Sequence, residues 1–350
     1  MKRIATYKLL LTAAFALAAW AAAVVVVVTP FSASAQNQNS PQQRPTPRPT
    51  PTPVDDSGTT IEITTREVRL PVTVLDKKEQ PVSGLTLNDF QIFEDKQPQQ
   101  IKGFIDEREE LPIYIGVLMD TSSSSAGKLQ FEKQAAKDFI YTVMRRRKDK
   151  VAFVTFDDEV RLHQDFTEKQ DLLDKAIDRI KKPGHKTALY DAVWEFCDQK
   201  LRGVVGRRVI VVITDGDDTH SRAYLSEAVA IAQQTETIIY AISTKGGFSG
   251  SSVPGVQAGT VKDGGDQELN KLCEETGGRA FFTGDILALE RSFGKVAREL
   301  RSQYILTYRP TNETYDGRER KIEVRLASKR DGTKVISRRS YKPAQAASNK

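Results

Sequence analysis

The sequence predicts an α/β protein whose centre is a doubly wound, mostly parallel β-sheet of the Rossmann-like type. First, short apolar runs alternate with amphipathic segments between about residues 111 and 301. Continuous apolar strands separated by helices are typical of a parallel sheet covered on both faces. Second, the flanking segments alternate apolar and polar residues, as half-buried strands do. These flanks predict a small β-sandwich built from N- and C-terminal segments, with the α/β domain inserted between them.

The N-terminus carries the pattern of an export signal. Basic residues at Lys2 and Arg3 precede an apolar stretch from Leu9 to Val28, and Ala33-Ser34-Ala35 forms a small-residue cleavage site. This pattern predicts a secretory signal peptide at 1–35. The apolar stretch is also long enough to span a bilayer, so an uncleaved N-terminal membrane anchor is the alternative. We expect an exported protein, placed in the periplasm, the cell envelope or outside the cell.

Residues 36–58 predict a disordered linker. Proline stands at every second position from Pro45 to Pro53. Because proline lacks the N–H donor, this stretch can form neither a helix nor a central strand. An extended, polyproline-like spacer follows from this composition.

The predicted N-terminal β segment covers 59–108, with Ile61 and Ile63, then 68–74 and 90–95, as strand candidates. The C-terminal β segment covers 303–342, before a disordered tail at 343–350. Its strand candidates are 304–308, 320–326 and 335–341, and Asp331-Gly332 predicts a hairpin-type turn before the last of them.

The predicted α/β domain covers 109–302. Its strand candidates are 113–119, 151–156, 209–214, 238–243 and 280–283. Its helix candidates are 128–145, 169–180, 188–201, 224–234, 267–275 and 286–301. The only two cysteines, Cys197 and Cys273, stand at apolar positions of predicted helices, so we expect two buried free thiols.

Oxygen-bearing residues follow two of these strands and precede one helix. Asp120-Thr121-Ser122-Ser123-Ser124 comes after the first strand, Asp215 after the strand at 209–214, and Thr187 just before the third helix. In open α/β sheets, sites form beyond the carboxyl ends of the strands. Carboxylate and hydroxyl oxygens suit hard cations such as Mg²⁺, Mn²⁺ or Ca²⁺ rather than zinc. The sequence therefore predicts a divalent cation site at this edge.

These residues match a known site in order, spacing and predicted context. Asp120-x-Ser122-x-Ser124, Thr187 and Asp215 resemble the metal-ion-dependent adhesion site of von Willebrand factor type A domains. The flanking segments resemble those of bacterial exported "VWFA-related" proteins. The resemblance implies that Asp120, Ser122, Ser124 and Thr187 contact the cation, most simply Mg²⁺, and that Asp215 does so directly or through water.

Family members mostly bind proteins, and many use a glutamate or aspartate of the partner as the last metal ligand. The resemblance therefore implies a metal-dependent adhesion module whose partner presents a carboxylate. It also raises the prospect that metal capture moves the last helix, 286–301.

Five further residues are candidates for the rim or support of this site. Asp217 and Asp218 suit a rim or a helix cap. Asp191 lies one helical turn after Thr187, where it could support the site or form plain helix surface. His185 and His220 flank the metal loops.

Other function classes remain as alternatives or are disfavoured. A structural part of an envelope assembly, with the cation only stabilising the loops, is the first alternative. A metal-dependent hydrolase is less favoured, since no Ser–His–Asp set or paired Asp-x-Asp accompanies the loops, so we expect no enzyme. The net charge of +6 comes from basic residues spread along the chain, which disfavours nucleic-acid binding. The sequence leaves the oligomeric state open.

Overall fold

The computed structural model describes the folded part of the chain, which belongs to one compact unit. The described residues are 67–106, 111–122, 129–214, 217–244, 264–283, 286–314, 316–328 and 331–343. The predicted signal peptide, the linker, the strand at Ile61 and Ile63 and all but the first residue of the tail lie outside these ranges and stay predictions. No helix among the described residues is both long and apolar enough to cross a membrane.

A six-stranded sheet forms the centre of the α/β part, in the order β10-β9-β8-β5-β6-β7. The five parallel strands are β5 (Ile113–Asp120), β6 (Lys150–Phe156), β8 (Arg207–Thr214), β9 (Thr237–Ser243) and β10 (Ala280–Phe282). The edge strand β7 (Val160–Thr167) runs antiparallel to β6. The predicted fold class, a mostly parallel doubly wound sheet, is confirmed.

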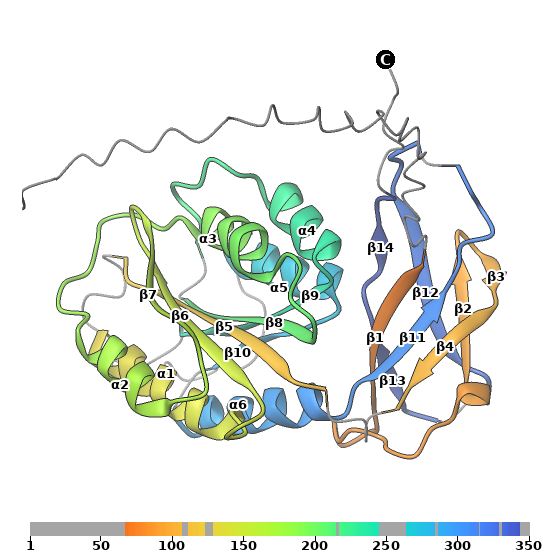
Figure 1. Cartoon of the computed structure of the whole chain (residues 1–350), viewed down its shortest axis with the longest axis horizontal. Helices are drawn as coiled ribbons and strands as arrows, with labels where there is room; N and C mark the ends of the chain where they lie inside the picture. The colour runs from red at the N-terminus through yellow and green to blue at the C-terminus, as the bar shows by residue number, and fades with distance from the viewer. Residues whose placement is uncertain are drawn as a thin grey trace, which may run out of the picture. The chain divides into compact units, whose positions relative to one another are not determined.

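Helices cover both faces of this sheet (Figure 1). One apolar cluster joins the sheet to α1 (Leu129–Val143), α2 (Gln170–Asp178) and α6 (Ile286–Arg301). A second joins the other face to α3 (Leu189–Phe196), α4 (Leu225–Gln234) and α5 (Gly264–Thr276). The strands are apolar on both sides because both sides are buried.

The central strand also depends on one glycine. A Cβ placed on Gly116 of β5 would come within 2.2 Å of the Phe196 ring. Glycine therefore lets α3 pack directly against the sheet, and this contact sets the position of the loop that enters α3 at Thr187.

The flanking segments form two antiparallel four-stranded sheets, ordered β13-β1-β11-β4 and β14-β12-β2-β3. Four strands precede the α/β part: β1 (Val68–Leu75), β2 (Phe90–Glu94), β3 (Gln97–Gln99) and β4 (Ile101–Ile105). Four follow it: β11 (Tyr304–Tyr308), β12 (Arg320–Leu326), β13 (Lys334–Ile336) and β14 (Ser340–Tyr341). One apolar cluster contains residues of both sheets, so they pack face to face as a sandwich.

A buried carboxylate links the two sheets of this sandwich. Glu94 of β2 is 2% exposed and accepts hydrogen bonds from the hydroxyls of Tyr308 (2.7 Å) and Tyr341 (2.9 Å). The Arg320 guanidinium lies 3.0 Å from the same carboxylate. The charge is thus paired and hydrogen-bonded, as a buried carboxylate requires.

Several sequence-based expectations were wrong in detail. The strands β3, β4 and β7 were not predicted; β7 is a partly exposed edge strand and so lacks a continuous apolar run. The single strand expected at 335–341 is two strands in different sheets, because β13 pairs with β1 and β14 with β12. The turn at Asp331-Gly332 therefore does not close a simple hairpin. The helix expected at 188–201 is α3 followed by a π-helical turn, Cys197–Leu201.

Both cysteines are buried free thiols, as expected. Burial raises the pKa of the Cys197 thiol to about 12 and raises that of Cys273 as well. A thiol reacts as its thiolate, so neither residue is poised for chemistry.

The last helix is tied to its surroundings at several points. The Arg207 guanidinium donates hydrogen bonds to the carbonyls of Leu300 (2.9 Å) and Gln303 (3.3 Å), at the carboxyl end of α6. Glu79, in the loop after β1, pairs with Lys295 of α6 (2.5 Å) and with Arg279 (2.7 Å). The start of β11 follows only three residues after α6 ends, so helix and sandwich are coupled through the chain itself.

Candidate functional site

Asp120 ends the central strand β5, and its carboxylate is fully buried. One carboxylate oxygen accepts the backbone N–H of Ser122 (2.9 Å), and the other accepts the Thr214 hydroxyl (2.7 Å). Thr214 ends β8, which pairs with β5 along its length. These two hydrogen bonds fix the orientation of the carboxylate at the carboxyl edge of the sheet.

The loop after Asp120 is held by its neighbours. The Thr121 hydroxyl donates to Asp157 (2.8 Å), and the Thr121 carbonyl accepts the N–H of Gly184 (2.7 Å). Arg161 pairs with the buried Asp157 carboxylate at 2.8 Å. Gly184 lies so close to Asp157 that a Cβ on it would come within 2.5 Å of that side chain. The β5 loop and the loop before α3 are therefore in direct contact.

Thr187 joins a third loop to this edge. Its carbonyl accepts the N–H groups of Thr219 (2.9 Å) and His220 (3.0 Å), and its own N–H donates to the Thr219 hydroxyl (3.0 Å). Thr187 is 4% exposed. Its side-chain hydroxyl makes no hydrogen bond with any residue that the structure describes. An ion is one of the groups that such a hydroxyl can bind.

Asp218 and Asp191 organise the loop after β8. One Asp218 oxygen accepts the N–H groups of Leu189 (2.8 Å) and Tyr190 (3.3 Å) in the first turn of α3. The Asp191 carboxylate accepts those of Arg222 (3.1 Å) and Ala223 (2.8 Å). Both carboxylates are thus engaged in holding α3 and the 217–224 loop together.

The remaining rim candidates are exposed. Asp217, His185 and His220 all lie on the surface. The N–H of His185 donates to Asp158 (2.7 Å) and lowers the pKa of that carboxyl below its usual range. The Lys186 ammonium lies 3.3 Å from a ring nitrogen of His220, which brings side chains of two loops together at the rim.

Of the five predicted cation ligands, the structure describes Asp120, Ser122 and Thr187. Ser124 and Asp215 lie outside the described residues. The described three are all buried, at 0%, 2% and 4% exposure, and the loops that carry them are hydrogen-bonded to one another through Gly184. Within the described ranges, no three His, Cys, Asp or Glu side chains are grouped as metal ligands. A site built here would therefore depend on hydroxyls as well as carboxylates, a donor set that suits a hard cation.

Sequence reasoning missed the residues that support this edge. Thr214 holds Asp120 itself, and Asp157 and Gly184 hold Thr121, but these contacts are tertiary and carry no local pattern. Thr214 offered one usable signal, since it directly precedes Asp215 at the end of an apolar run.

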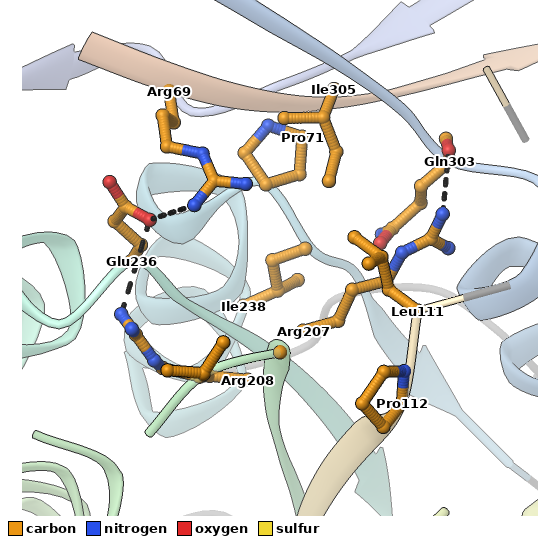
Figure 2. A pocket seen from close by; sticks show the side chains of 12 residues that line it. Arg69, Pro71, Leu111, Pro112, Arg207, Arg208, Glu236, Ile238, Gln303 and Ile305 are labelled. Carbon is orange, nitrogen blue, oxygen red and sulfur yellow. Dashed lines mark hydrogen bonds and ion pairs between the residues drawn. The ribbon is translucent and has the colours of Figure 1, made fainter. Parts of the chain in front are cut away.

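A separate pocket lies at the opposite, amino-terminal edge of the same sheet (Figure 2). Its volume is about 140 Å³, and its walls come from the amino ends of β5, β8 and β9 and from β1 and β11. Glu236 lies 3.9 Å from both Arg69 and Arg208, and Arg207 is bound to Gln303 as described above. These charged groups pair with one another or with backbone carbonyls where the α/β part meets the sandwich. The pocket lies at the other edge of the sheet from Asp120, so it is not part of the candidate site.

The chain is similar to one known protein family. The family model described as von Willebrand factor type A domain matches residues 115–295, just over half of the chain. No curated protein matches the chain.

Three solved structures illustrate the likeness. Proximal thread matrix protein 1 from the mussel byssus is 18% identical, with a TM-score of 0.44, and the match covers 59% of this chain and 50% of that one. An aerotolerance-related membrane protein from Bacteroides fragilis is 17% identical, with a TM-score of 0.41 over 54% of this chain and 98% of that one. The PilB minor pilin from Streptococcus sanguinis is 14% identical, with a TM-score of 0.41 over 56% and 62%. This chain thus spans about half of the length of the mussel protein.

Proposed function

Because the chain belongs to the von Willebrand factor type A domain family, we propose that it is an exported binding module, not an enzyme, that grips a partner protein through a divalent cation. The cation, most simply Mg²⁺ with Mn²⁺ or Ca²⁺ as alternatives, would be held by Asp120, Ser122, Ser124, Thr187 and Asp215. When bound, it supplies an open coordination position for a carboxylate of the partner.

The buried and oriented Asp120 carboxylate is the observation that carries this proposal. It accepts hydrogen bonds from Ser122 and Thr214, and its loop is bonded through Gly184 to the loop of Thr187. The Thr187 hydroxyl makes no hydrogen bond with a described residue, so it is available to a cation. The oriented Asp120 carboxylate supplies the negative charge that a divalent cation needs.

The number of oxygen ligands supports a carboxylate from the partner. Two carboxylates and three hydroxyls neutralise a divalent cation but do not fill its shell of six or more oxygens. Water completes the shell, and an aspartate or glutamate of the partner can replace one water. The chain's own residues would hold the cation and orient the loops.

Export is proposed on the sequence alone. The basic start, apolar stretch and small-residue site of residues 1–35 are typical of a signal peptide. The folded part would then act in the periplasm, the envelope or outside the cell. If the apolar stretch is retained, residues 36–58 would serve as the spacer between a membrane tether and the binding module.

Calorimetric titration with Mg²⁺ and Mn²⁺ tests the cation site. We compare the wild type with Asp120→Ala and with Asp120→Asn, which keeps the side-chain shape. Asp171→Ala, an exposed carboxylate on α2, is the matched control. Saturable binding by the wild type and control that both Asp120 variants lose is the expected result.

The same proteins separate the two non-enzymatic alternatives. In a binding module, Asp120→Asn stays folded and loses metal-dependent partners. In a purely structural role, that variant unfolds at a lower temperature in Mg²⁺ and keeps its partners. Wild-type protein that binds neither cation would contradict the proposal.

A further inference from the structure

Four exposed basic side chains stand in the two loops that flank the candidate cation site. We call Lys181, Lys182, Lys186 and Arg222 the basic rim. Lys186 directly precedes Thr187, and the backbone N–H of Arg222 is bound by Asp191 of α3. The hydrogen bonds between Thr187 and residues 219 and 220 hold the two loops together, so Lys186 and Arg222 belong to adjoining segments.

These four side chains make few close ion pairs with described residues, although Lys186 and Arg222 lie close enough to act electrostatically on Asp158 and Glu195. Nearby carboxylates are occupied by backbone N–H groups: Asp218 by the first turn of α3, Asp191 by residues 222 and 223, and Asp158 by His185. The Arg222 side chain is 89% exposed, and its closest ion-pair contact, to Asp191, is 3.7 Å long. Among the described residues of these loops, Asp217 is a further carboxylate on the surface.

Two exposed aromatic side chains border the same surface. Tyr224, two residues after Arg222, is 74% exposed, and Trp194 on α3 is 39% exposed. Trp194 lies three residues after Asp191 on the helix and therefore shares its face. Exposed tryptophan, tyrosine and arginine together are the residue types that dominate protein–protein binding energies.

We propose that the partner docks through an acidic peptide segment. One carboxylate of the segment reaches the cation, its neighbours contact Lys186 and Arg222, and apolar groups pack on Tyr224 and Trp194. This inference rests on the proposed function and names the chemistry of its partner. A protein segment fits better than a nucleic acid, because four basic side chains form a short patch rather than the long tracks that follow a phosphate backbone.

Fluorescence anisotropy of labelled probes on the full chain tests the assignment. The probe is a short peptide of alternating Glu and Gly, compared with its Gln counterpart and with an oligothymidylate of equal charge, each in Mg²⁺ and in EDTA. The test variant is Lys186→Glu with Arg222→Glu. The matched control is Lys102→Glu with Lys321→Glu, exposed residues of the sandwich strands β4 and β12, which changes the net charge equally.

We expect the Glu peptide to bind in Mg²⁺ more tightly than the Gln peptide. The rim variant should weaken this binding roughly tenfold or more and flatten its dependence on salt, while the control should not. Three results would each overturn the assignment: no binding of the Glu peptide, equal binding of the Gln peptide, or no effect of the rim variant. An oligothymidylate that binds as tightly through the same side chains would overturn it too.

A parallel titration of the wild type with Mg²⁺ alone measures cation binding separately from peptide binding. If the cation does not bind but the Glu peptide still binds through the rim, the proposed function fails while the acidic partner stands. If the cation binds and the rim variant binds the Glu peptide as the wild type does, the proposed function stands and the acidic partner is excluded.

Discussion

At Thr187, the backbone and the side chain have separate tasks. The backbone N–H and carbonyl join two loops through Thr219 and His220. The hydroxyl has no such task among the described residues, which leaves it for the cation. The two tasks can therefore be separated by substitution.

Replacing Thr187 with valine removes the hydroxyl and keeps the shape. We expect Mg²⁺ affinity to fall at least as much as the roughly tenfold loss typical when a metal-supporting group is removed, with the thermal midpoint in EDTA unchanged or raised. Thr187→Ser keeps the hydroxyl and should retain most of the affinity. A valine variant that binds Mg²⁺ like the wild type would exclude Thr187 as a ligand.

The residues of the site differ in how far sequence could identify them. Asp120, Ser122 and Thr187 form a spaced pattern and were predicted as ligands, a role that awaits measurement. Asp157 was not among the predicted site residues, yet it is 2% exposed and holds Thr121. Its importance comes from a fold contact 36 residues away in sequence, which no local pattern encodes.

At the scale of elements, α6 is held more firmly than the family resemblance suggests. Arg207 binds carbonyls at its carboxyl end, and Glu79 pairs with Lys295 on its side. The Lys295 hydrogen bond, with further contributions from Arg279, lowers the Glu79 pKa from its ordinary value of 4.5 to about 2. Movement of α6 on metal capture would have to break these contacts.

The Glu79 pair predicts a specific pH dependence. A depressed carboxyl pKa stabilises the fold above the unfolded pKa, and this stability is lost as pH falls from about 4.5 towards about 2. Glu79→Gln should therefore lower the free energy of unfolding at pH 7 by about 1 kcal/mol or less, because the side chain is 45% exposed and solvent screens the pair.

Thermal unfolding at pH 7, 4 and 2.5 measures this difference. We expect the difference in thermal midpoint between the wild type and Glu79→Gln to become steadily smaller as pH falls. Glu168→Gln, at an exposed position, is the control and should show no gap. A gap that stays constant with pH would show that the pair does not contribute through its charge.

The elements themselves were predictable where burial was uniform. The strands β5, β6, β8 and β9 are apolar over most of their length and were located from sequence within a residue or two. The edge strand β7 and the short strands β3 and β4 were not, since their residues are largely exposed or mixed. The sequence pattern also did not predict which strands pair with one another. β13 and β14 are neighbours in sequence, but they belong to different sheets of the sandwich.

At the scale of the whole molecule, the two ends of the folded chain complete one another. β1 pairs with β11, and β2 with β12, across the intervening α/β part. The α/β part therefore enters and leaves on the sandwich side, at the amino end of β5 and the carboxyl end of α6. The candidate cation site lies at the opposite, carboxyl edge of the sheet.

We propose that the carboxyl edge of the sheet holds a divalent cation for a partner's carboxylate. An anomalous difference map from crystals of the chain grown with Mn²⁺ tests this most directly. We expect one strong peak within bonding distance of the Asp120, Ser122 and Thr187 oxygens, and its loss in Asp120→Asn. A map with no peak at these oxygens, or with peaks only elsewhere, would contradict it.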